Sequence, residues 1–262
     1  MTPKRRAFTL IELLVVVSII AILIAILIPA LASARASAIS VSCLSNQRQL
    51  MIAVSTHAAD QQGRIPYGPE EPNGGLFNGI DDLYIINGMT TSLISDRFGR
   101  VVGAGLLLDD YLSETPEVLF CPGADQEIVV QEQLDLVGVD NAISGYIYRH
   151  GTNTIADLEA FRDFGTPLDR RIQLDNLGLN RNGDPAQAMF VDNNFILPEG
   201  SSFEAFHRSN HERKFVNIAY ADGHAEQRRN DDSTYEVNVV GTNLFNAIDQ
   251  MVEVFEAADL AE

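Results

Sequence analysis

The sequence predicts an α+β fold in which one long N-terminal helix packs on a mostly antiparallel β-sheet. A continuous apolar run opens the chain, and a helix-favouring stretch without Gly or Pro follows it from residue 30 to residue 62. The C-terminal half holds several short segments rich in β-branched and aromatic residues, which favour strands. We therefore expect a single globular head carried on a helical stalk.

Composition limits the classes of function that the chain can serve. Of its 262 residues 46% are hydrophobic and 21% are charged, which is ordinary for a folded protein. The formal net charge is −18, and the few basic residues include a cluster at positions 4–6. Such an acidic body repels nucleic acid, so we expect no nucleic-acid partner.

The first element is an apolar run over residues 8–28, interrupted only by Thr9, Glu12 and Ser18. At about 1.5 Å per residue it spans roughly 30 Å, the thickness of one hydrocarbon core. The basic cluster before it places the N-terminus in the cytoplasm. A secretory signal peptide has a shorter apolar region, and a plain membrane anchor gives no reason for Glu12. A cleaved export signal whose apolar part is retained accounts for both.

The string "RRAFTLIELLVV" closely resembles the type IV prepilin signal. The resemblance implies cleavage between Ala7 and Phe8 by prepilin peptidase, methylation of the new N-terminus on Phe8, and an assembly role for Glu12 and Pro29. In that family the amine of one subunit meets the Glu of a neighbour, which pairs two charges that are costly apart in lipid. The family usually has Gly before the cut, where this chain has Ala7.

The resemblance also implies a pilin-like architecture, a location and a function. Residues 1–7 are the leader, 8–29 the transmembrane and assembly helix, 30–60 its amphipathic continuation and 61–262 the head. The implied precursor lies in a bacterial inner membrane and then enters a periplasmic or cell-surface filament. Its partners are other pilin or pseudopilin subunits and a secretion or pilus machine. The alternative is an inner-membrane-anchored binding module that is not polymerised.

The helix should continue past the membrane, from about residue 9 to about residue 59, and bend near Pro29, where a backbone hydrogen bond is lost. In the head, "GLLLDDYLS" suggests a short helix and "EVLFCPGAD" a short strand ending in a turn. Strands are predicted in "SGYIYRHG", "AQAMFVDNNFIL" and "KFVNIAYADGHAEQRR", the last with a two-residue type I′ hairpin turn at Asp222-Gly223. The segment "NLFNAIDQMVEVFEAADLAE" predicts a closing amphipathic helix.

One segment of the head carries candidate ligands. "HRSNHERKFVNIAYADGHAE" resembles the C-terminal signature of planctomycete-type prepilin-like proteins, although ten residues rather than nine separate His211 from Asp222. His207, His211, Asp222 and His224 could gather there, with Asp192 on a neighbouring strand. Imidazole and carboxylate suit zinc, whereas calcium prefers oxygen ligands. Because some pseudopilins bind calcium, calcium is preferred over zinc, and a turn without any metal is the simplest alternative.

Two further features bear on function. Cys43 and Cys121 are an even pair in a chain that resembles an exported one, so they are either a disulfide or two buried thiols. The sequence contains no G-x-S-x-G, H-E-x-x-H, C-x-x-C or Gly-rich phosphate motif. We therefore expect no catalytic residues and no enzymatic activity.

Overall fold

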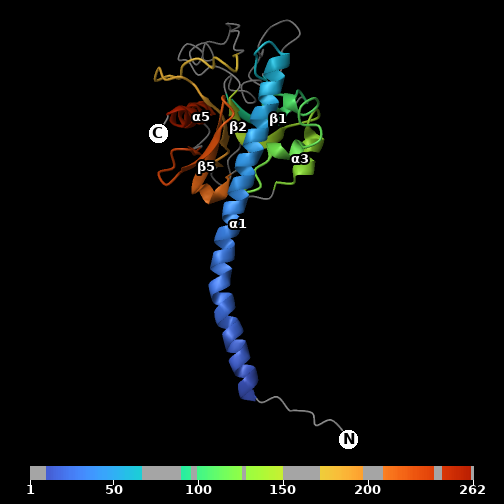
Figure 1. Cartoon of the computed structure of the whole chain (residues 1–262). Helices are drawn as coiled ribbons and strands as arrows, with labels where there is room; N and C mark the ends of the chain where they lie inside the picture. The colour runs from blue at the N-terminus through green and yellow to red at the C-terminus, as the bar shows by residue number, and fades with distance from the viewer. Residues whose placement is uncertain are drawn as a thin grey trace.

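The computed structural model describes residues 10–66, 90–95, 99–125, 128–149, 172–196, 209–238 and 244–260. In these ranges it confirms the α+β architecture, with one long helix and a five-stranded antiparallel sheet (Figure 1). The elements in chain order are α1 (Leu10–Asp60), β1 (Thr90–Ser95), η1 (Gly103–Leu107), η2 (Pro116–Leu119), α3 (Val130–Leu136), β2 (Ala142–Arg149), β3 (Ala188–Asp192), β4 (Phe195–Ile196), η3 (His211–Arg213), β5 (Phe215–Tyr220), β6 (Ala225–Arg229), β7 (Val237–Asn238) and α5 (Leu244–Asp259).

Helix α1 has two halves with different surroundings. Figure 1 shows its blue first half standing outside the head and its second half lying along the head. The helix runs unbroken through Pro29, with a gentle curve and no sharp break. In the second half the buried residues include Cys43, Gln47, Leu50 and Val54, which share one face of the helix. The predicted long helix is confirmed.

The sheet has the strand order β1-β2-β3-β5-β6, and all neighbouring strands are antiparallel. The predicted strands in "SGYIYRHG", "AQAMFVDNNFIL" and "KFVNIAYADGHAEQRR" are confirmed as β2, as β3 with β4, and as β5 with β6. A separate two-stranded pair, β4 with β7, is parallel. The closing helix is confirmed as α5.

The two faces of the sheet carry different helices. On β5 the side chain of Ala219 belongs to a core cluster that includes Leu50 and Val54 of α1. Its neighbours in the strand, Ile218 and Tyr220, belong to a second cluster that includes Phe255 of α5. This alternation follows from the period of two in a strand, and it places the sheet between α1 and α5. Nearly continuous burial along β2, β3 and β5 is the result.

Two short segments of the head differ from the prediction, one wholly and one in part. The segment "EVLFCPGAD" is not a strand: η2 begins at Pro116, whose fixed φ suits a helical first turn, and the amide of Phe120 donates to the carbonyl of Glu117. The segment "GLLLDDYLS" begins in a short helix, as predicted, but that helix is the 3₁₀ helix η1, which ends at Leu107 and is followed by turns.

The turn between β5 and β6 also differs from the prediction. Gly223 has φ +89°, but Asp222 is not among the residues with positive φ, so the turn is not type I′. The amide of Gly223 donates to the carbonyl of Tyr220, and the amide of Tyr220 donates to the carbonyl of His224. These bonds define a three-residue hairpin loop that ends in a left-handed glycine.

Candidate functional site

The first candidate is the apolar half of α1. Its large aliphatic side chains are exposed, for example Leu10 at 81%, Ile26 at 70% and Leu31 at 64%. Among the described residues, this helix is long and apolar enough to cross a membrane, and no part of its most apolar stretch is buried against the head. Glu12 is the single charged residue between Leu10 and Arg35. The segment therefore needs lipid or other helices to cover it.

The structure places some predicted processing residues and not others. Glu12 and Pro29 are both exposed on the part of α1 outside the head. Ala7 and Phe8 lie outside the described residues, and so does His207. The cleavage and methylation at the Ala7–Phe8 junction therefore remain predictions from the sequence.

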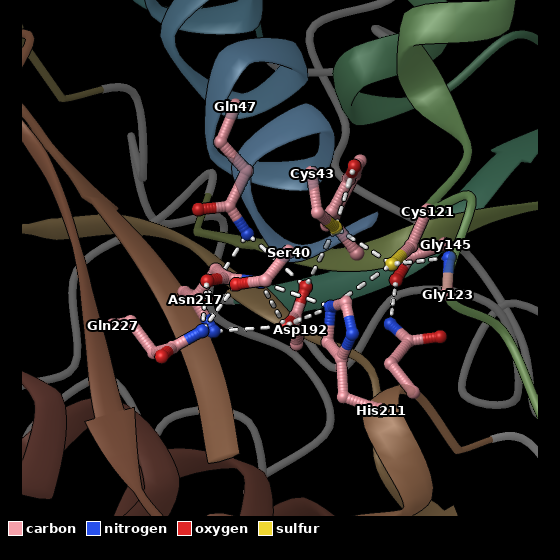
Figure 2. Close-up of polar contacts among 12 residues, drawn as sticks. Ser40, Cys43, Gln47, Cys121, Gly123, Gly145, Asp192, His211, Asn217 and Gln227 are labelled. Atoms are coloured by element: carbon pink, nitrogen blue, oxygen red, sulfur yellow. Dashed lines mark hydrogen bonds and ion pairs between the residues drawn. The ribbon is translucent and has the colours of Figure 1, made fainter. Parts of the chain in front are cut away.

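The second candidate is a buried polar cluster between α1 and the sheet. We call it the Cys–His–Asp cluster, and its members come from four separate segments of the chain (Figure 2). They are Cys43 of α1, Cys121 after η2, Asp192 at the end of β3 and His211 at the start of η3. One ligand atom from each residue lies within 4.8 Å of the other three, and all four residues are buried.

Individual contacts in the cluster are short. Cys43 Sγ lies 2.6 Å from Cys121 Sγ and 3.5 Å from Asp192 Oδ1. The imidazole Nε2 of His211 lies 3.3 Å from Cys121 Sγ and 3.3 Å from Asp192 Oδ2. The cluster thus brings two sulfur atoms, one imidazole nitrogen and one carboxylate to a single point.

A shell of hydrogen-bond donors orients Asp192. The backbone amide of Asn217 donates to Asp192 Oδ2 at 2.8 Å, and its side-chain amide donates to the same oxygen at 2.9 Å. The other oxygen, Oδ1, accepts from Gln47 Nε2 at 3.3 Å, one helical turn along α1 from Cys43. Figure 2 shows Gln47 and Asn217 beside this carboxylate. The carboxylate, which is fully buried, is therefore satisfied on both oxygens.

The electrostatics of the cluster argue against a nucleophilic cysteine. Burial raises the pKa of the Cys43 thiol, and the hydrogen bond to Cys121 and the nearby Asp192 carboxylate add to the shift. Burial also raises the pKa of Cys121. A reactive cysteine needs the opposite shift. For His211, burial lowers the pKa, but hydrogen bonds to Asp192 and Cys43 outweigh burial and raise the pKa to about 10.

The predicted set of metal ligands is divided by the structure. Asp192 and His211 meet in the cluster, whereas Asp222 and His224 lie on the loop between β5 and β6. There His224 Nδ1 contacts Asp222 Oδ1 at 2.5 Å, and both side chains are more than half exposed. This pair lies beside the left-handed Gly223, apart from Asp192 and His211.

Sequence reasoning missed Cys43 and Cys121 as members of the same site as His211. It treated the cysteines only as a disulfide or as buried thiols, because no short spacing links them to a histidine. A local signal did exist: Cys43 and Gln47 are one helical turn apart on the face of α1 that must be covered. The cysteines belong to one site because η2 and β3 meet α1 in the folded head.

Comparison with known proteins identifies one feature of the chain. A family model described as the Prokaryotic N-terminal methylation motif matches residues 2–28. No curated protein and no solved structure matches the chain. The motif, together with the apolar N-terminal helix, supports a type IV pilin-like precursor. Since the match ends at residue 28, the resemblance of the segment around His211 and Asp222 stays a prediction.

Proposed function

We propose that the chain is a structural subunit of a type II secretion-like pseudopilus or a type IV pilus. In this proposal prepilin peptidase processes the precursor, which is then assembled through α1. The observation that carries it is the first half of α1: an apolar helix, exposed outside the head, with a carboxylate near its start and a methylation motif over the same residues. The secretion pseudopilus is the version we favour.

The physical argument begins with the exposed aliphatic surface. Each square ångström of it costs about 25 cal/mol in water, so it must be covered. Lipid covers it in a membrane-anchored precursor, and neighbouring copies of the same helix can cover it in a filament. Helix packing in lipid gains little from apolar contact, because lipid tails are as apolar as leucine. A charge pair supplies the specific contact that apolar packing lacks.

Glu12 is placed to make such a pair. It lies in the first turn of the described part of α1, on an exposed face. Cleavage after Ala7 would free a cationic amine on Phe8, and methylation would keep its positive charge. When that amine pairs with Glu12 of a neighbour, the two opposite charges compensate each other, which lowers the cost of holding both in lipid.

The second half of α1 would attach the head rigidly to the assembled first halves. Gln47 donates to the carbonyl of Asn217 on β5 at 3.0 Å, and Arg48 donates to the carbonyl of Ala225 on β6 at 3.0 Å. Leu50 is fully buried in the core cluster on this face. Since one continuous helix joins both halves, packing of the first halves would fix where each head is displayed. This role is assembly and display rather than catalysis.

The test compares two variants in the exposed half of α1. Glu12→Ala should still lose residues 1–7 but should enter filaments far less, because the free amine loses its partner. Ser18→Ala is the matched control, since Ser18 is exposed on the same helix and its hydroxyl donates to the carbonyl of Val15, within its own helix, at 2.8 Å. Incorporation is measured as the fraction of chain in sheared high-molecular-weight material from the native host.

Intact-mass analysis of the mature native chain separates this proposal from the binding module. A filament subunit requires the mass that starts at a methylated Phe8. A mature chain that retains residues 1–7, or a Glu12→Ala chain incorporated as well as Ser18→Ala, would contradict the proposal. The first result would favour an anchored module that does not polymerise.

A further inference from the structure

We propose that the Cys–His–Asp cluster is a zinc site that fastens α1 to the head. Its ligands are Cys43 Sγ, Cys121 Sγ, His211 Nε2 and one carboxylate oxygen of Asp192. The proposal goes beyond filament assembly and does not depend on it, because every ligand lies in the part of the chain that packs within the head.

The donor set selects the metal. Two sulfur atoms and an imidazole are ligands that zinc prefers and that calcium does not, since calcium takes oxygen ligands. Four protein ligands with no open position are typical of a structural zinc site rather than a catalytic one. This set replaces the predicted one, because Asp222 and His224 lie elsewhere.

Two of the contacts fit tetrahedral coordination through a single carboxylate oxygen, Asp192 Oδ2. Zinc bonds of about 2.0–2.3 Å place tetrahedral ligands about 3.3–3.8 Å apart. The contacts of His211 Nε2 with Cys121 Sγ and with Asp192 Oδ2 are both 3.3 Å, whereas Cys43 Sγ lies 3.5 Å from the other carboxylate oxygen, Oδ1. The two sulfur atoms, at 2.6 Å, would have to separate by about 1 Å to bind the ion.

Groups around the ligands hold them in place, as the outer shell of a metal site does. Asn217 and Gln47 fix the Asp192 carboxylate through three donated hydrogen bonds. The amide of Gly123 donates to Cys121 Sγ at 3.3 Å, and the Tyr146 hydroxyl lies 3.3 Å from Cys43 Sγ. The sulfur atoms and the carboxylate therefore have partners that orient them toward a common centre.

The backbone that presents His211 is strained. His211, Glu212 and Arg213 have φ values of +55°, +52° and +60°, so three consecutive residues with side chains adopt the left-handed conformation. This costs roughly 1–2 kcal/mol per residue. Such strain persists only where the surroundings impose it, and it concentrates at functional sites. Here it directs the imidazole into the cluster.

Two glycines give the ligands room to meet. A Cβ on Gly123 would lie 2.5 Å from Nδ1 of the His211 ring, and a Cβ on Gly145 would lie 2.4 Å from the backbone nitrogen of Cys121. Real Cβ atoms do not approach so closely. Glycine at these positions therefore lets the Cys121 segment lie between β2 and the imidazole.

A zinc ion at this point would join four segments that are far apart in the sequence. Cys43 belongs to α1, Asp192 to β3 and His211 to η3, while Cys121 follows η2. Binding energy at such a site is folding energy, because the unfolded chain does not hold the four ligands together. The ion would also offset two of the three negative charges that the thiolates and Asp192 bring into a buried space.

A disulfide between Cys43 and Cys121 is the competing use of the same two sulfur atoms. It removes two hydrogen atoms from the chain and leaves no thiolate to bind a metal. The two states thus differ both in mass and in metal content, and one preparation can distinguish them.

The experiment uses the full chain, purified in detergent through a tag without histidines and dialysed without chelator. The zinc content per chain is measured by elemental mass spectrometry, and the mass of the intact chain is measured without reductant. We expect about one zinc per chain and the mass of the fully reduced protein. Cobalt added in place of zinc should give sulfur-to-metal charge-transfer absorption, a readout that needs no variant.

Variants then assign the ligands. Cys43→Ser and His211→Ala should each lower the zinc content at least about tenfold, because each removes one of four ligands. His224→Ala is the matched control, since it removes an exposed histidine outside the cluster, and it should keep the zinc. Zinc retained in Cys43→Ser, or lost equally in His224→Ala, would overturn the proposal. A zinc-free chain two hydrogens lighter would establish the disulfide instead. None of these outcomes bears on the N-terminal mass or on incorporation into filaments.

Discussion

The attachment of α5 to the sheet depends on a buried ion pair that Asp259→Ala should break. Arg149, the last residue of β2, is 1% exposed, and its Nη2 donates to Asp259 Oδ2 at 2.9 Å. The other oxygen of Asp259 accepts from the backbone amides of Gln187 at 2.8 Å and Ala188 at 2.9 Å. The guanidinium also lies 4.8 Å from the centre of the Phe255 ring. One carboxylate thus pairs with a buried cation and accepts from two backbone amides, of which that of Ala188 is buried.

The magnitude follows from these contacts. Removing one partner of a buried ion pair costs about 3–5 kcal/mol, because the remaining charge has no counter-charge. The orphaned buried amide of Ala188 adds about 1–3 kcal/mol, whereas water can reach the amide of the exposed Gln187. We expect the free energy of unfolding to fall by about 4 kcal/mol or more. For a chain of this size, that lowers the melting temperature by roughly 8–16 °C.

The assay is thermal unfolding of the full chain in detergent, followed by near-ultraviolet circular dichroism of tyrosine, since the chain has no tryptophan. Glu253→Ala is the control, because Glu253 lies on the same helix with an exposed side chain. It should change stability by about 0.5 kcal/mol or less. Equal melting temperatures for Asp259→Ala and Glu253→Ala would refute the claim that this ion pair holds α5 on the sheet.

Two further predictions concern α1. Leu50→Ala should destabilise the head by about 2–5 kcal/mol, because Leu50 is fully buried, whereas Ile52→Ala should cost far less, because Ile52 is 66% exposed. Equal effects in thermal unfolding would show that this face of the helix is not docked. Burial lowers the pKa of His57 below its usual value near 6.5, so the unfolded state binds the proton more readily. The neutral His57 therefore makes its full contribution to the free energy of unfolding above about pH 6.5, and this contribution is lost as the pH falls below that value. When the free energy of unfolding is measured against pH, His57→Gln should reduce the loss of stability in this acidic range.

Properties that depend on neighbouring residues could be predicted from the sequence. The length and composition of the apolar run predicted α1, and β-branched and aromatic enrichment predicted β2, β3, β5 and β6. The turn between β5 and β6 was predicted in place but not in type. Asp222-Gly223 is compatible with more than one loop, and the backbone bonds between Tyr220 and His224 select the three-residue form.

The division between sequence and tertiary structure is clearest at the two candidate sites. Glu12 and its apolar run are contiguous, so the methylation motif and the membrane-length helix are properties of the sequence itself. The Cys–His–Asp cluster is not contiguous. Cys43 meets Cys121, Asp192 and His211 because η2, β3 and η3 converge on one face of α1 when the head closes around it. Periodicity and motifs describe residues within a few turns of one another, whereas long-range packing decides which distant side chains share a buried point.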